Sequence, residues 1–187
     1  MRGSAPASVR DAGERDVRAI MEIYNDAVLH SSAIWNETTV DAANRAAWIA
    51  GRRGAGYPVL VAVEESGAVL GYGSFRDWRA FEGYRHTVEH SLYVAKDRRG
   101  AGVGEALLIE LIERARLAGK HVMVAAIDAN NEASIRLHQK LGFAQVGFLK
   151  EVGAKFGLWL DLALFQLTLD SRAASGERGE IAGGGPT

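Results

Sequence analysis

The sequence contains no cysteine in its 187 residues. Without a thiol the chain can form no disulfide, no thiolate nucleophile and no cysteine-ligated metal site, so its chemistry must use oxygen and nitrogen groups. No run of about 18 apolar residues is present that could span a bilayer, and the N-terminus lacks the basic-then-apolar layout of a secretory signal. We therefore expect a cytoplasmic protein that neither contacts a membrane nor is exported.

Neither sign of charge predominates: Lys and Arg number 22, Asp and Glu 23, and the formal net charge is −1. A nucleic-acid-binding protein would carry a basic excess, so we expect no nucleic-acid partner and favour a small molecule. A chain of this length with 48% hydrophobic residues can bury one core of ordinary size. We predict a single domain over residues 8–170, flanked by disordered tails at 1–7 and 171–187 that are poor in apolar groups.

Hydrophobic spacing predicts an alternation of strands and helices. Period-two or continuous apolar runs predict strands, and apolar positions three and four residues apart predict helices. In chain order we predict strand 8–10, helix 17–29, helix 39–53, strands 58–64, 69–75 and 87–95, helix 103–118, strand 120–127, a helix through residue 140, and strands 144–152 and 157–170. This order fits an α+β fold with a mixed sheet covered by helices, and it fits no doubly wound pattern.

A glycine-rich stretch, Arg98-Arg99-Gly100-Ala101-Gly102-Val103-Gly104, follows the predicted strand 87–95 and opens the next helix. Glycines at alternate positions leave backbone N–H groups free to converge on an anion at the helix start, where the helix dipole adds positive potential. By itself this signal is weak, because ordinary turns have the same composition. The stretch is no Walker motif, since no Gly-Lys-Ser/Thr follows, and it lacks the early βαβ unit of a dinucleotide-binding fingerprint.

Three motifs around this loop are more specific. They are Leu92-Tyr93-Val94, Arg99-x-x-Gly102-x-Gly104 and Asn130-Asn131-x-x-Ser134-x-x-Leu137-His138-x-x-Leu141-Gly142-Phe143. In this order and spacing the chain resembles the GNAT N-acetyltransferases over about residues 8–170. The stretches 71–81, 84–94 and 153–161 are similar to the phosphinothricin and methionine sulfoximine N-acetyltransferase branch. The resemblance implies the GNAT fold, a mixed central sheet of about seven strands flanked by about four helices.

The resemblance also implies acetyl-CoA as the co-substrate and no metal. In the family the glycine loop binds the pyrophosphate, the preceding strand pairs with the pantetheine arm and polarises the thioester carbonyl, and the Asn-Asn turn with its helix touches the arm. The residues so implied are Leu92, Tyr93, Val94, Arg99, Gly100, Ala101, Gly102, Val103, Gly104, Asn131 and Ser134. Elementary chemistry agrees for the loop, because N–H groups at a helix start bind an anion without a metal. The Asn-Asn turn has the simpler alternative of being only a helix cap.

Two catalytic residues follow from the same resemblance. An amine must be neutral to attack, and Glu89, three residues before Leu92, matches the proposed general base of the branch. His138 stands where most of the family have a tyrosine that protonates the departing thiolate and where this branch has histidine, so it is a candidate acid or base. Simpler alternatives exist, because Glu89 could only balance nearby basic residues and His138 could be an ordinary satisfied histidine.

The acceptor site is expected outside these motifs. The candidate residues are Trp35, Arg79, Ala80, Phe81, Arg85, Lys155 and Phe156. Either arginine of the loop between two predicted strands could form a bidentate pair with a carboxylate, and the aromatic rings could wall the acceptor side chain. The resemblance favours residues 79–81, with Trp35 and the turn at 155–156 as weaker candidates.

These observations predict an acetyl-CoA-dependent N-acetyltransferase that acetylates, by direct transfer, the α-amino group of a small amino acid or analogue. Phosphinothricin, methionine sulfoximine and methionine sulfone are the acceptors that the resemblance implies. One alternative is a member of the same family that acts on a protein N-terminus, a lysine or a polyamine. Another is a non-catalytic CoA-binding module, against which Glu89 and His138 argue. A homodimer is expected from the family alone.

Overall fold

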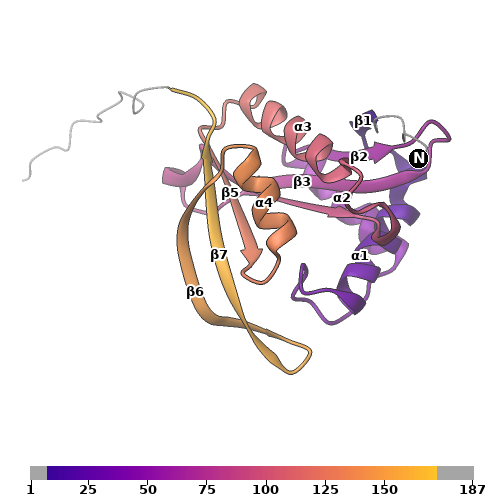
Figure 1. The fold of residues 1–187 in the computed structure, drawn as a ribbon. Helices are drawn as coiled ribbons and strands as arrows, with labels where there is room; N and C mark the ends of the chain where they lie inside the picture. Colours follow the sequence, from indigo (N-terminus) through magenta and orange to yellow (C-terminus); the bar gives the residue numbers. More distant parts are fainter. Residues whose placement is uncertain (1–7, 172–187) are drawn as a thin grey trace, which may run out of the picture.

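The fold is built on one seven-stranded sheet, which a computed structural model describes within residues 8–171 (Figure 1). The predicted disorder of residues 1–7 and 171–187 lies, apart from Ser171, outside the described residues. The strands are β1 (Ser8–Asp11), β2 (Val59–Val63), β3 (Val69–Asp77), β4 (Thr87–Val94), β5 (Val122–Asp128), β6 (Ala144–Lys155) and β7 (Leu158–Thr168). They lie in the order β1-β2-β3-β4-β5-β7-β6, and every neighbouring pair is antiparallel except β4 and β5. The predicted α+β fold with a mixed sheet is confirmed.

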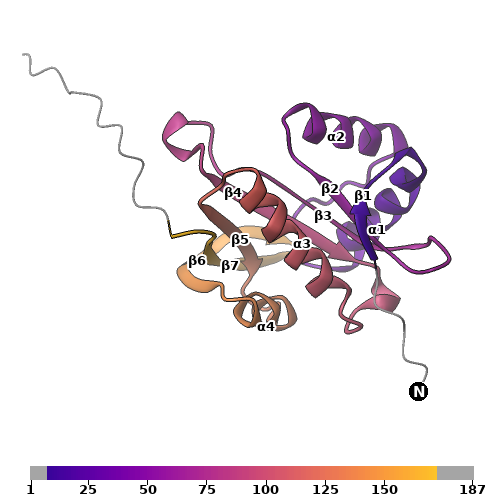
Figure 2. The same cartoon turned by 90° about the horizontal axis from the view of Figure 1, so that it is seen from above.

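Two pairs of helices cover the two faces of the sheet (Figure 2). The helices α1 (Val17–His30) and α2 (Ala42–Gly54) lie on one face, and α3 (Val103–Leu117) and α4 (Glu132–Lys140) lie on the other. Three short 3₁₀ helices lie in the connections: η1 (Glu14–Asp16), η2 (Glu82–Tyr84) and η3 (Lys96–Arg98). Each face of the sheet has its own cluster of buried apolar side chains. Within residues 8–171, no helix is long and apolar enough to cross a membrane.

Glycines in β3 let α3 approach the sheet closely. A Cβ added at Gly71 would lie 2.8 Å from the carbonyl oxygen of Tyr93, and one at Gly73 would lie 2.9 Å from the side chain of Leu111. Leu107 and Leu111 of α3 are both 0% exposed on this surface. Full burial of such a side chain stabilises the fold by about 1.5–3 kcal/mol. This packing therefore holds the start of α3 beside the end of β4.

The parallel strands β4 and β5 separate before either of them ends. Their pairing covers only Thr87–Glu89 opposite Val122–Val124. Beyond it, β4 continues to Val94 and β5 to Asp128. The half of β4 nearest the glycine loop is thus paired with β3 but not with β5.

The last two strands form a long hairpin whose tip differs from the prediction. We predicted a break at residues 153–156, but β6 runs through Lys155 and the turn contains only Phe156 and Gly157. Both turn residues have positive φ, 54° and 73°, as in a type I′ turn. The register of β6 also shifts between Leu149 and Gly153. A glycine inside a strand can mark a close contact instead of a turn, and the contact at Gly153 is described below.

Candidate active site

The glycine loop opens α3, as predicted. Gly100 and Gly102 have φ of 77° and 81°, a left-handed conformation that favours glycine, and Gly102 is the N-cap residue of the helix. Within the described part of the chain, the N–H groups of residues 100–102 donate to no backbone carbonyl. Arg99, whose side chain is 50% exposed, adds a cation beside them. Free donors at the positive end of a helix fit a pyrophosphate, and no group of three His, Asp or Glu side chains in residues 8–171 could hold a metal.

The backbone of β4 has one open edge beside this loop. Successive residues of a strand direct their N–H and C=O groups to opposite edges, and the N–H of Ala95 donates to the carbonyl oxygen of Leu70 on the β3 side at 2.9 Å. Leu92 and Val94 therefore direct their backbone groups to the edge from which β5 has separated, whereas Tyr93 faces β3. Of the three predicted residues, only Leu92 and Val94 therefore direct backbone groups to the edge where a pantetheine arm could form hydrogen bonds with the strand.

His138 of α4 is buried and stacked against His90 of β4. His138 is 2% exposed, the ring centroids lie 5.0 Å apart, and the two Nε2 atoms lie 3.0 Å apart. Nδ1 of His138 lies 2.7 Å from the carbonyl oxygen of Ser134, which only accepts, so this nitrogen carries the hydrogen. His138 Nε2 then accepts from His90 Nε2. The remaining His90 Nδ1 is buried without a partner among the described residues.

Burial keeps both rings of this pair neutral. Burial, reinforced by the neighbouring His138, lowers the pKa of His90 to about 3. Burial also lowers the pKa of His138, against the opposing effect of its hydrogen bond to Ser134. Both nitrogens of the neutral His138 ring form the hydrogen bonds described above, Nδ1 with the carbonyl oxygen of Ser134 and Nε2 with His90. The predicted exchange of a proton with a departing thiolate requires the bond between His138 and His90 to break.

The start of α4 lies against the start of α3. Asn131 is the N-cap of α4, and its Oδ1 accepts from the N–H of Ser134 at 3.1 Å. A Cβ added at Gly104 of α3 would lie 3.3 Å from the side chain of Leu137, one turn further along α4. Asn131 is therefore a helix cap, a role that is compatible with contact to a cofactor. Contact of Asn131 and Ser134 with the pantetheine arm stays a prediction.

Glu89 lies among basic side chains on the face that α1 and α2 cover. Its Oε2 lies 2.9 Å from Nη2 of Arg76, the residue opposite it on β3, and its side chain is 18% exposed. Arg52 of α2 lies close enough to interact with both: burial and the charge of Arg76 lower the pKa of Arg52, and Glu89 opposes them. Nε of Arg52 is buried without a hydrogen-bond partner among the described residues. A half-buried cation whose buried Nε donor is unpaired favours an anionic group beside Glu89.

The two predicted catalytic residues approach β4 from opposite faces. Side chains alternate along β4: His90 and Leu92 face α3 and α4, whereas Glu89 and Tyr93 face α1 and α2. Groups on opposite faces can serve one reacting centre only where a sheet opens. The pairing of β4 with β5 ends at Glu89, so this separation is the place where Glu89 and His138 could act together.

The predicted acceptor loop follows β3 and is open to solvent. All of its candidate residues are exposed: Arg79, Ala80, Phe81 and Arg85. The guanidinium of Arg79 lies 5.3 Å from the ring centroid of Trp78, and Nη1 of Arg85 lies 3.3 Å from the carbonyl oxygen of Glu82. Among the described residues no carboxylate forms an ion pair with either arginine. Both cations are therefore available to an acceptor carboxylate.

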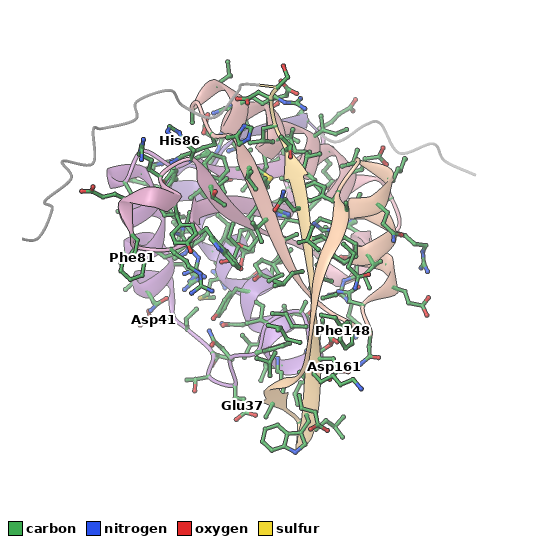
Figure 3. The ribbon with its side chains drawn as sticks, turned by 90° about the vertical axis from the view of Figure 1, so that its left-hand side faces the viewer. Glu37, Asp41, Phe81, His86, Phe148 and Asp161 are labelled. Atoms are coloured by element: carbon green, nitrogen blue, oxygen red, sulfur yellow. The ribbon has the colours of Figure 1, made fainter. Side chains whose placement is uncertain are left out.

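The other predicted acceptor residues meet at the hairpin tip, close to the connection between α1 and α2. Lys155 is 1% exposed, and its ammonium faces backbone carbonyls of the interior. Trp35 lies against Gly153, and Phe156 is 56% exposed beside Lys155. Figure 3 shows Phe81 of the acceptor loop and Glu37 of the α1–α2 connection on the same side of the molecule. The structure thus brings Trp35, Lys155 and Phe156 together at the hairpin tip. The other predicted acceptor residues lie in a different segment, the loop after β3.

Sequence reasoning did not select three residues of this region: His90, Arg52 and Arg76. A signal existed for His90, because the period-two pattern of β4 placed a histidine on a buried apolar face, where it needs a partner. A weaker signal existed for Arg52, which lies four residues after Trp48 and so on the same face of its helix. No local signal identifies Arg76 as the partner of Glu89, because their contact depends on the register between two strands.

Three comparisons with known proteins bear on this site. A model of the acetyltransferase (GNAT) family matches residues 18–143. The L-methionine sulfoximine/L-methionine sulfone acetyltransferase of Pseudomonas paraeruginosa is 60% identical over 164 residues, which cover 88% of this chain and 95% of that protein. A crystal structure of a GNAT superfamily phosphinothricin acetyltransferase from Sinorhizobium meliloti in complex with acetyl-CoA has a TM-score of 0.87 and 38% identity, and covers 95% of this chain and 98% of its own. A ribosomal-protein-alanine N-acetyltransferase from Brucella melitensis has a TM-score of 0.84 and 52% identity, with 86% and 99% covered.

Proposed function

The chain belongs to the acetyltransferase (GNAT) family and is an N-acetyltransferase, and we propose that its acceptor is the α-amino group of a small amino acid or analogue. Methionine sulfoximine, methionine sulfone and phosphinothricin are the acceptors that we propose to test. The observation that carries this proposal is 60% identity over 95% of the length of a relative named for the first two. Glu89 and the residues around it supply the chemistry that an α-amino acid requires.

The donor is acetyl-CoA, which supplies an acetyl group activated as a thioester. We propose that the N–H groups of residues 99–104 hold its pyrophosphate and that Arg99 adds charge. The open edge of β4 at Leu92 and Val94 offers N–H and C=O groups to the pantetheine arm. An N–H group aimed at the thioester carbonyl would stabilise the negative charge that develops on its oxygen. Asn131 and Ser134 would touch the arm from the start of α4.

The acceptor side of the proposal rests on Glu89 and the arginines. An α-amino group is mostly protonated at neutral pH and attacks only after it loses a proton, which the Glu89 carboxylate would accept. The acceptor carboxylate would pair with Arg79 or Arg85, as predicted, or with Arg52, whose buried Nε lacks a partner in residues 8–171. For His138 the predicted acid or base role stays a proposal.

Release of free thiol tests this function. Purified protein, acetyl-CoA and each of the three proposed acceptors should release thiol well above the rate without acceptor. The N-acetylated product should be identified by mass spectrometry. A reaction with the same protein and acetyl-CoA but without acceptor is the control. Thiol release at background level with all three acceptors would refute the proposal. Tight acetyl-CoA binding without turnover of any amine would favour a non-catalytic CoA-binding module.

A second candidate is acetylation of the N-terminal alanine of a protein, which is favoured by the 52% identity to the Brucella melitensis enzyme. A free amino acid presents a carboxylate beside its amino group, whereas a peptide presents a neutral amide. Methionine sulfone should therefore react faster than its carboxamide if arginines recognise the acceptor. A faster reaction of the carboxamide, or of an alanine-terminated peptide, would favour the second candidate, and turnover of lysine or a polyamine alone would indicate another amine.

We also propose that residues 8–170 act as a single domain and that the protein works as a homodimer in the cytoplasm. Support for the dimer comes from the β6–β7 hairpin, whose apolar side chains are 43–70% exposed. They are Val146, Phe148, Leu149, Val152, Leu158 and Trp159. So many exposed large apolar side chains on one hairpin are uncommon on a monomer and are typical of a protein interface.

A further inference from the structure

The tip of the β6–β7 hairpin is attached to the end of α1 through a buried lysine. Nζ of Lys155 lies 2.6 Å from the carbonyl oxygen of Ser31 and 3.4 Å from that of Ala27, and it also donates to the carbonyl oxygen of Ile34. Three carbonyl acceptors satisfy the three hydrogens of an ammonium group. Ala27 and Ser31 lie at the C-terminal end of α1, where the helix dipole is negative, and the carbonyl oxygen of Ala27 also accepts from the N–H of Ser31. The helix end and the nearby charge of Glu37 together stabilise the lysine ammonium.

The hairpin is bent toward this attachment. Three residues of β6, between Leu149 and Gly153, stand opposite a single residue of β7, Asp161, and a bulge of this kind bends a strand. Oδ1 of Asp161 accepts from the N–H of Glu151 at 2.7 Å and so holds the bulge. Figure 1 shows the tip of the hairpin beside the connection that leaves α1. The hairpin thus begins in the sheet and ends on the face where α1 and Glu89 lie.

The backbone of the hairpin is strained at two places. Within residues 8–171 the non-glycine residues with positive φ are Glu151 (52°) in the bulge and Phe156 (54°) in the turn. Such a conformation is uncommon for a residue with a Cβ and persists where the surroundings impose it. At the turn, the contact next to Phe156 that can hold this conformation is the one between Lys155 and the end of α1.

Two aromatic rings are placed by this attachment. The ring of Trp35 occupies the space in which a side chain at Gly153 would lie, so that only glycine fits there. The ring of Phe156 lies 4.7 Å from Nζ of Lys155 and is 56% exposed. Trp35 belongs to the segment 31–41, whose carbonyls at Ser31 and Ile34 bind Lys155. Trp35 thus lies against Gly153 and Phe156 beside Lys155, so both rings lie at the tip of the hairpin.

We propose that Lys155 is a positioning residue: by tying the hairpin tip to the end of α1, it seats Trp35 and Phe156 as an aromatic wall that selects the acceptor side chain. The inference rests on the proposed function. The wall suits an uncharged side chain with a methyl group on a polar sulfur centre, as in methionine sulfone, because aromatic rings bury the methyl group and add no charge. Lys155 itself does not touch the acceptor.

The test is the variant Lys155→Met, with Lys150→Met as the control, since Lys150 is exposed on the same strand. The KM for methionine sulfone should rise about tenfold in Lys155→Met, while kcat and the KM for acetyl-CoA change by less than about threefold. The preference for methionine sulfone over alanine, which is too short to reach the wall, should fall by about the same factor. Lys150→Met should change none of these values. An unchanged preference, or an equal loss for every acceptor and for acetyl-CoA, would overturn the proposal.

A second variant guards against a folding defect in the first. Gly153→Ala displaces Trp35 without touching the lysine and should lower the same preference, whereas Gly51→Ala, in open space on α2, should not. The double variant Lys155→Met/Gly153→Ala should lose little more than either single variant, because both act on one wall.

Hydrogen exchange separates this inference from the proposed function. Residues 31–40 should exchange faster in Lys155→Met than in wild type, and not in Lys150→Met, whatever the acceptor proves to be. Unchanged exchange would refute the attachment even in an active enzyme. Wild-type protein that acetylates no amino acid would instead refute the proposed function, and the role of the wall in selection would fall with it.

Discussion

Glu89 is surrounded by positive charge that comes from other parts of the chain. Arg76 pairs with it at 2.9 Å, and Arg52 of α2 lies near both. A carboxylate is the form that can take a proton from an ammonium group, and the ion pair with Arg76 fixes the position of the Glu89 side chain. The same cations attract the carboxylate of an amino acid and so bring its α-amino group to the base.

Replacement of the base gives the most direct prediction for a single residue. Glu89→Gln keeps the shape of the side chain but removes its proton acceptor, so kcat should fall about 100-fold or more. The KM for acetyl-CoA should change little, because Glu89 faces α1 and α2 while the glycine loop lies at the end of β4. Steady-state kinetics with methionine sulfone measures both values. Glu65→Gln, in the exposed turn between β2 and β3, is the control, and a kcat equal to wild type in Glu89→Gln would exclude Glu89 as the base.

The buried histidine pair should make stability depend on pH. The pKa of His90 is about 3 in the folded protein and about 6.5 in an unfolded chain. Above about pH 6.5 both states are neutral at this residue; as the pH falls toward 3, only the unfolded state gains the proton, so the folded state loses stability. At pH 4.5 the loss from His90 amounts to about 3 kcal/mol. The lowered pKa of His138 acts in the same direction.

Urea unfolding followed by circular dichroism measures this effect. The free energy of unfolding should fall between pH 7.5 and 4.5 in the wild type, and should fall by about 3 kcal/mol less in His90→Gln, which lacks the titrating ring. His86→Gln, a half-buried histidine in the preceding loop, should retain the wild-type difference. Equal pH differences in wild type and His90→Gln would contradict the buried, neutral pair.

Among the structural elements, the glycine loop is defined by its backbone conformation. Gly102 has φ of 81° at the N-cap of α3, and no atom lies within 4 Å of a Cβ added there. A substitution would therefore act through backbone conformation and through the space that a phosphate needs. The residue beside it, Ala101, has no such conformation and provides a matched position.

Gly102→Val should raise the KM for acetyl-CoA about tenfold or more, because a β-branched residue resists positive φ and its methyl groups cover the N–H groups of the loop. The kcat at saturating acetyl-CoA should change much less. Calorimetric titration with CoA and steady-state kinetics measure the two effects. Ala101→Val adds the same side chain at ordinary φ and should disturb CoA binding less. Equal effects of the two substitutions would argue against the conformation of Gly102 as the cause.

The hairpin element was only partly predictable. Its two strands are apolar runs, and their existence was predicted and confirmed. The turn was expected at residues 153–156 because glycine is common in turns, but Gly153 makes room for Trp35 and the turn lies at Phe156 and Gly157. Trp35 is more than a hundred positions away in the chain, so no window of local sequence contains both partners of this contact.

At the scale of the whole molecule, the exposed apolar side of the hairpin predicts self-association. Light scattering after gel filtration should give twice the chain mass of 20.1 kDa. Trp159→Lys places a charge on this surface and should weaken dimerisation by about 2 kcal/mol, about 30-fold in Kd. Leu117→Lys is the control, since Leu117 is 84% exposed at the end of α3 and does not belong to the hairpin. A wild-type monomer, or an equal effect of both substitutions, would refute this surface as the dimer interface.

The sequence by itself determined the order of the elements, the glycine loop before α3 and the alternation of faces along β4. These features depend on spacings of a few residues, and hydrophobic periodicity and turn chemistry report them directly. Only the tertiary structure decided that His90 pairs with His138, that Arg76 pairs with Glu89, and that Lys155 is buried against the end of α1. His90 and His138 are 48 residues apart and Lys155 and Ser31 are 124 apart. Contacts at such separations depend on strand register and on the bend of a hairpin, which no local pattern specifies.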